Sequence, residues 1–117
     1  IEKFQGWSGS GDTPETVFDR DELLDNVTLY WLTNSGTSSA RLYWESFTNF
    51  DLSPVTIPSA ATIFPREIMQ PSERWMATRY TDIRYFRRAE TGGHFAALQV
   101  PDLFVAEVRA ALRAMEL

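Results

Sequence analysis

The sequence of 117 residues contains no cysteine and a single histidine. The absence of cysteine excludes disulfide bonds and thiolate chemistry. No apolar run approaches the roughly 20 residues that a membrane-spanning helix needs. Nothing resembles a signal peptide either, so a cytoplasmic location is the default expectation. Because the first residue is Ile1 rather than methionine, we expect a chain cut by nicking, processing or design.

Positive charge is also scarce. The chain has 11 lysine and arginine residues against 16 aspartate and glutamate residues, which gives a net charge of −5. This balance argues against nucleic acid or an anionic membrane surface as a partner. With 44% hydrophobic and 14% aromatic residues, the composition nevertheless predicts a globular chain rather than a disordered one.

The charge is distributed unevenly along the chain. Residues 1–60 carry nine acids and three bases, whereas residues 61–117 carry seven acids and eight bases. Two proline-containing segments, Leu52–Pro54 and Ile57–Pro58, indicate a loop near this change of charge. We therefore divide the chain into residues 1–50 and residues 51–117.

The first part is predicted to be mainly helical. Gly6–Thr16 is rich in Gly, Ser and Thr and indicates an exposed loop. Arg20–Thr33 has apolar residues every three or four positions and acids in its first turn, which predicts a helix. A second helix is predicted from Ser38 to Phe47, with Tyr43 on its apolar face.

Strand-like and helix-like segments alternate in the second part. The expected order is a buried strand at Ser59–Phe64, a helix at Pro71–Tyr80, a strand at Asp82–Phe86 and a helix at Asp102–Met115. Such an order is typical of the α/β class with parallel strands, although periodicity alone leaves a buried helix open for the first segment. Two strands do not make a stable sheet, so we expect more strands from elsewhere. Three arginines are interpreted as a solvated strand end: Arg84, Arg87 and Arg88.

The only histidine lies at a position where open α/β sheets hold functional groups. His94 directly follows Gly92 and Gly93, between a strand-like and a helix-like run, and ligands bind outside the carboxyl ends of such strands. Glu67 follows the preceding strand after Pro65 in the same way. About one strand–helix–strand unit separates the two residues, so parallel neighbours would bring both to the same sheet edge.

An acid and a histidine that converge suggest general base chemistry. Imidazole titrates near neutrality, so His94 can take a proton from water, and Glu67 can orient the ring and stabilise the imidazolium. The alternatives are ordinary ones. A lone histidine is more often structural, and Glu67 could merely stabilise a helix start or pair on the surface.

Several short motifs occur in a definite order along the chain. They are Ile1–Phe4 with Trp7, Leu29–Trp31, Ser38–Tyr43, Phe64–Glu67 and Gly92–Ala97. Together they resemble the C-terminal part of epoxide hydrolases of the microsomal type, in the α/β-hydrolase superfamily. The resemblance implies an α/β fold in which residues 1–50 end a helical lid and residues 51–117 form the last two strand–helix units of the core. The aspartate nucleophile, the oxyanion-hole segment and a first tyrosine of that family would all precede residue 1.

The resemblance also implies a reaction. The aspartate would attack an epoxide carbon to give a hydroxyalkyl ester, while Tyr43 donates a proton to the epoxide oxygen. His94, oriented by Glu67, would then activate water and release a vicinal diol. The residues expected along the substrate channel are Tyr30, Trp31 and Phe95. The resemblance implies no metal or organic cofactor. The expected partners are the N-terminal segment of the same enzyme and a small-molecule epoxide. A homo-oligomer is left open.

Two other functions stay open at this point. The chain could belong to another α/β-hydrolase, such as a haloalkane dehalogenase or an esterase. Tyr43 would discriminate between them, because halide and acyl leaving groups need no phenolic donor, although a tyrosine on an apolar helix face is often part of the core. The chain could also be a non-catalytic fragment that binds a partner through its exposed sheet edge.

Overall fold

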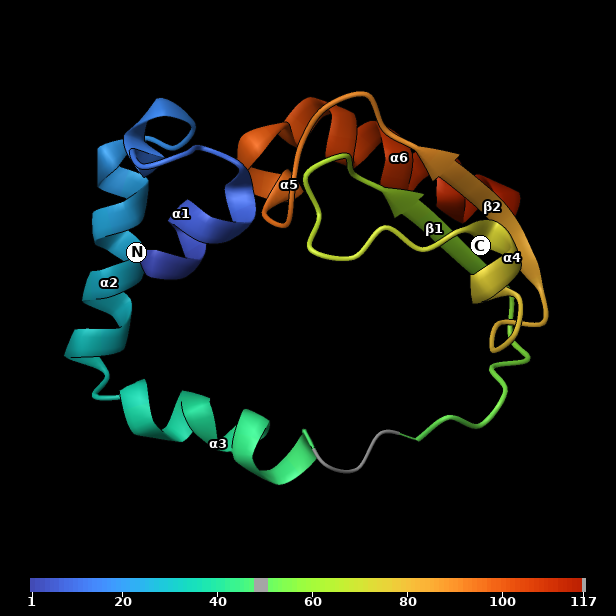
Figure 1. The fold of residues 1–117 in the computed structure, drawn as a ribbon, viewed down its shortest axis with the longest axis horizontal. Helices are drawn as coiled ribbons and strands as arrows, with labels where there is room; N and C mark the ends of the chain where they lie inside the picture. The colour runs from blue at the N-terminus through green and yellow to red at the C-terminus, as the bar shows by residue number, and fades with distance from the viewer. Residues whose placement is uncertain (48–50, 117) are drawn as a thin grey trace.

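The computed structural model describes residues 1–47 and 51–116. Its elements are α1 (Glu2–Ser8), the 3-10 helix η1 (Pro14–Thr16), α2 (Arg20–Leu32), α3 (Gly36–Ser46), β1 (Ser59–Ile63), α4 (Glu73–Met76), β2 (Ile83–Arg88), α5 (Ala96–Gln99) and α6 (Pro101–Ala114). In Figure 1, α2 and α3 run apart from the sheet, whereas α1 lies beside α5. The boundary expected between residues 50 and 51 touches residues 48–50, which lie outside the described residues.

β1 and β2 form a two-stranded parallel sheet, which confirms the predicted pairing and the α/β class. The register places Ile63 beside Arg88, so the carboxyl ends of both strands lie at one edge. An isolated parallel bridge between Arg66 and Gly93 continues the pairing past these ends. Both segments that were expected to carry functional residues therefore leave the sheet side by side.

The last helix, α6, packs on the sheet with a small apolar core. Phe64, Ala89 and Ala96 are buried together, and Leu103 and Phe104 of α6 pack against them. α6 matches the predicted helix closely, and Pro101 occupies its first turn, where a missing N–H is tolerated.

A buried carboxylate fastens α6 to both strands. Glu107 is 3% exposed, and it accepts hydrogen bonds from the Thr62 hydroxyl at 2.9 Å and the Tyr85 hydroxyl at 2.8 Å. Arg87 forms an ion pair with the other carboxylate oxygen at 2.9 Å. Arg87 is exposed to solvent as expected from the sequence, but it also has a structural role that the sequence did not predict, because a buried acid on the covering helix needs a partner.

Two expectations from the sequence are corrected near the sheet and the N-terminus. The helix predicted at Pro71–Tyr80 is limited to α4, which Ser72 caps by accepting a hydrogen bond from the backbone of Trp75. Tyr80 instead forms a parallel bridge with Val55. This pairing extends the sheet at the amino end of the strands and ends the helix early.

The loop predicted at Gly6–Thr16 contains regular structure at both ends. α1 continues to Ser8, which is fully buried, and ends at Gly9 in a left-handed conformation with φ of 71°. η1 then covers the last three residues of the predicted loop. The glycine-rich composition is misleading here because α1 is held by contacts with residues much later in the chain.

Much apolar surface is left uncovered. Trp31 on α2 and Trp44 on α3 are 80% and 87% exposed. The radius of gyration is 16.5 Å, compared with about 13 Å for a compact domain of this length. Within the described ranges, every helix is too short or too polar to cross a membrane.

Candidate functional site

The segment after β1 turns tightly and presents an acid. Phe64 is buried, and its carbonyl accepts hydrogen bonds from the backbone N–H of Glu67 at 3.1 Å and from the Gln70 side chain at 2.6 Å. These bonds fold the chain back after Pro65. Glu67 is therefore held within one turn of the sheet edge.

The segment after β2 depends on two glycines. Gly92 has φ of 101°, and a Cβ atom there would lie 2.8 Å from the Phe64 ring and 2.9 Å from the Val100 side chain. A Cβ atom at Gly93 would lie 3.1 Å from the Trp7 carbonyl oxygen. Gly92 therefore has no room for a side chain, Gly93 has little, and His94 comes immediately after them.

Pairing between the two segments brings the acid and the histidine into contact. The backbone N–H of Arg66 donates to the Gly92 carbonyl at 3.1 Å. Because Arg66 pairs with Gly93, the residues that follow them, Glu67 and His94, become neighbours. Their closest atoms, His94 Nδ1 and Glu67 Oε1, are 2.7 Å apart, with 37% and 29% of the two side chains exposed.

This contact selects one form of the imidazole. Glu67 accepts hydrogen bonds when it is ionised, so Nδ1 of His94 carries the shared proton. The same carboxylate oxygen, Oε1, also accepts the backbone N–H of Ile68 at 2.7 Å. The other ring nitrogen of His94, Nε2, is then free to take a proton from a water molecule.

An apolar hollow of about 460 Å³ lies beside this pair. Glu67, His94 and Phe95 line it, together with Phe64 and Phe104 from the core. It adjoins β1, whose second edge is unpaired in the described sheet. The acid and the histidine therefore face a space that is large enough for a small apolar molecule or another part of a protein.

The other site residues expected from the sequence lie elsewhere. Tyr30 and Trp31 are on α2, Tyr43 is on α3, and these side chains are 44%, 80% and 58% exposed. Figure 1 shows both helices away from the loop between β2 and α5. Within residues 1–47 and 51–116, these side chains make no contact with Glu67 or His94, so their expected roles stay predictions.

Phe95, which lines the hollow beside His94, also packs against aromatic residues near the N-terminus. Its ring stacks on Phe4 with centroids 4.5 Å apart, and it meets Phe18 edge-on at 6.0 Å. Phe95 thus lines the hollow and also anchors α1. Its role toward a substrate stays a prediction.

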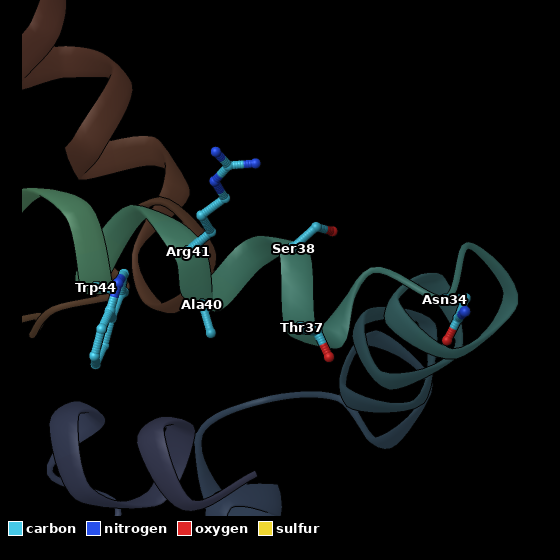
Figure 2. A pocket seen from close by; sticks show the side chains of 6 residues that line it. All are labelled: Asn34, Thr37, Ser38, Ala40, Arg41 and Trp44. Carbon is cyan, nitrogen blue, oxygen red and sulfur yellow. The ribbon is translucent and has the colours of Figure 1, made fainter.

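Another hollow lies at α3 and is separate from the acid–histidine pair. It has a volume of about 720 Å³ and is lined by Asn34, Thr37, Ser38, Ala40, Arg41 and Trp44. Figure 2 shows Arg41 and Ser38 on one side of α3, Trp44 on the other, and Asn34 on the turn before this helix. They do not converge on a common point, so the hollow lacks the arrangement of an active site.

One neighbour of His94 escapes sequence reasoning. Trp7 on α1 accepts the backbone N–H of His94 at 3.1 Å and packs its ring against the imidazole. The sequence singles out Trp7 only as part of the motifs that resemble epoxide hydrolases and by its spacing from Phe4 on one helix face, and neither signal places it beside His94. In the described residues, no group of three or more acids and histidines is placed to hold a metal ion.

Two of three comparisons with known proteins indicate the same family. No protein-family model matches the chain, but individual proteins do. The chain is 42% identical over 113 residues to a putative epoxide hydrolase of Stigmatella aurantiaca (strain DW4/3-1), covering 96% of this chain and 26% of the relative. It is 31% identical over 121 residues to epoxide hydrolase 1 of Sus scrofa, covering 93% of this chain and 27% of the relative.

A solved structure gives the same result. The crystal structure of juvenile hormone epoxide hydrolase from the silkworm Bombyx mori matches 98% of this chain and 32% of its own, with a TM-score of 0.87 and 28% identity. This chain spans about a quarter of the length of the curated relatives it matches. The chain is therefore homologous to the C-terminal part of epoxide hydrolases that include the microsomal type, and its fold is part of the α/β-hydrolase fold.

Proposed function

We propose that this chain supplies the base, its acid partner and a proton-donating tyrosine to an enzyme that converts an epoxide to a vicinal diol. The base is His94, the acid partner is Glu67 and the tyrosine is Tyr43. The 2.7 Å contact between His94 Nδ1 and Glu67 Oε1, at the ends of neighbouring parallel strands, carries this proposal. Homology to proteins named epoxide hydrolases supports an epoxide as the substrate.

The reaction proceeds in two steps. A carboxylate nucleophile, supplied by a preceding segment of the same enzyme, attacks an epoxide carbon and breaks its carbon–oxygen bond. Tyr43 gives its phenolic proton to the oxygen that is released, and a hydroxyalkyl ester remains on the enzyme. This step needs no base, because the nucleophile is already ionised.

The second step uses the residues of the strand ends. His94 Nε2 takes a proton from water, the water oxygen attacks the ester carbonyl carbon, and the ester bond breaks to release the diol. Glu67 accepts the hydrogen bond from Nδ1–H of His94 throughout and stabilises the imidazolium that forms. The proton then passes from His94 to the departing alkoxide, and the carboxylic acid left on the nucleophile gives its proton through solvent to the Tyr43 phenolate, so the enzyme returns to its starting state.

Substitution of the histidine separates the two steps. In the full-length enzyme, His94→Gln should form the covalent ester and fail to hydrolyse it, so intact-mass spectrometry should show a persistent adduct after mixing with styrene oxide. Glu67→Gln should hydrolyse the adduct slowly, because an imidazole without its acid partner keeps some basicity. Glu90→Gln, at an exposed acid of the same loop, is the matched control and should behave as wild type. A His94→Gln enzyme that neither gains mass nor loses turnover would contradict the proposal.

A further inference from the structure

The carboxyl end of α1 contacts His94 at both its backbone and its side chain. The backbone N–H of His94 donates to the Trp7 carbonyl at 3.1 Å. The Trp7 indole meets the imidazole with ring centroids 4.8 Å apart and an interplanar angle of 70°. Such an inclined contact between aromatic rings is attractive and has a preferred geometry, so Trp7 restrains both the position and the tilt of the ring.

Two side chains from the strand-end segments hold this end of α1. Gln99 donates its side-chain N–H to the Ser8 carbonyl at 2.9 Å, and Arg66 donates to the Gly9 carbonyl at 2.9 Å. The carbonyl groups of Trp7, Ser8 and Gly9 thus accept three hydrogen bonds from the segments that follow β1 and β2. The last carbonyls of a helix have no partner within it, and this junction supplies their partners.

The junction is closely packed. Ser8 is 0% exposed, and a Cβ atom at Gly9 would lie 2.5 Å from the Arg66 side chain. Gln99 Oε1 is also buried, and a Cβ atom at Gly93 would lie 3.0 Å from it. Little free space separates α1 from the loop that carries His94, so a change in the helix is transmitted to the loop.

Aromatic packing adds to this attachment. Phe4 lies one helical turn before Trp7, and both rings stack on Phe95, with centroid distances of 4.5 Å and 6.4 Å. Phe95 directly follows His94 in the chain. The residues on either side of the histidine backbone are therefore tied to α1, Gly93 by close contact and Phe95 by stacking.

We propose that Trp7 is a positioning residue for His94 in the hydrolysis of the covalent ester; this inference rests on the proposed function. Glu67 fixes one ring nitrogen, but the ring can still rotate about that single hydrogen bond. Trp7 packs against the ring and removes this freedom, so Nε2 stays aligned with the attacking water. A displacement of about 1 Å at a reacting group can cost roughly 10²-fold in rate.

The test compares two tryptophans in the full-length enzyme. Trp7→Leu should slow the decay of the covalent adduct about 10-fold or more and leave its formation within about twofold of wild type. Because only hydrolysis is slowed, kcat and KM should fall together and kcat/KM should stay constant. Trp7→Phe keeps an aromatic ring and should recover most of the rate. Trp75→Leu, at a 62% exposed tryptophan on α4, should match wild type.

The outcomes distinguish positioning from simple stability. A smaller folded fraction would lower kcat at constant KM, and that result, or adduct decay at the wild-type rate, would overturn the inference. If Trp7→Leu yields no soluble protein, Gln99→Met takes its place, because it removes the hydrogen bond to Ser8 and should slow adduct decay several-fold. His94→Gln is the reference variant. If His94→Gln forms no adduct, the proposed function itself fails. If its adduct persists while the adduct of Trp7→Leu decays at the wild-type rate, only the role of Trp7 is contradicted.

Discussion

The hydroxyl of Tyr43 is the smallest feature on which the proposed function depends. Its ring centroid lies 5.9 Å from that of Phe47, the residue that follows α3, and the Tyr43 side chain is 58% exposed. Tyr43→Phe removes the proton donor and little volume, so in the full-length enzyme adduct formation should slow by roughly 10²-fold while the melting temperature stays the same. Stopped-flow measurement at saturating styrene oxide tests this, and unchanged adduct formation would return Tyr43 to a packing role.

At the scale of elements, the attachment of α6 rests on Glu107. Glu107→Ala would leave the hydroxyls of Thr62 and Tyr85 without their acceptor and would remove the partner of Arg87. In the full-length enzyme, we expect the unfolding free energy to fall by about 2–3 kcal/mol, measured as a lower midpoint of denaturation. Glu116→Ala should have no such effect, because that side chain is 86% exposed and its ion pair spans 3.9 Å. Equal midpoints for the two variants would show that Glu107 does not hold the helix.

The sequence predicts some of the helices and strands and misses others. α2, α6 and β1 lie within a few residues of their expected bounds, because local sequence patterns determine them, such as the capping box of Asp19 and Glu22 at the start of α2. The contact of Glu67 with His94 also follows from parallel strands and turn residues. α1 and the early end of α4 do not, since distant contacts produce them: Trp7 with the His94 loop, and Val55 with Tyr80. No local pattern in the sequence records such pairs.

At the scale of the whole molecule, the described chain buries little apolar surface. Its sheet has two strands, β1 has an unpaired edge, and α2 and α3 expose large aromatic side chains. A complete domain of this size is stable by only about 5–15 kcal/mol, and the uncovered surface here removes much of that margin. We expect residues 1–117 to require a preceding segment that completes the sheet and covers these helices.

The most direct test of this account measures diol formation from styrene oxide by three samples: residues 1–117 alone, the full-length enzyme and its His94→Gln variant. The account predicts diol only from the wild-type full-length enzyme, together with aggregation or loss of cooperative unfolding in the isolated chain. A monomeric 13.4 kDa species that unfolds in one sharp transition and forms the diol unaided would contradict the account.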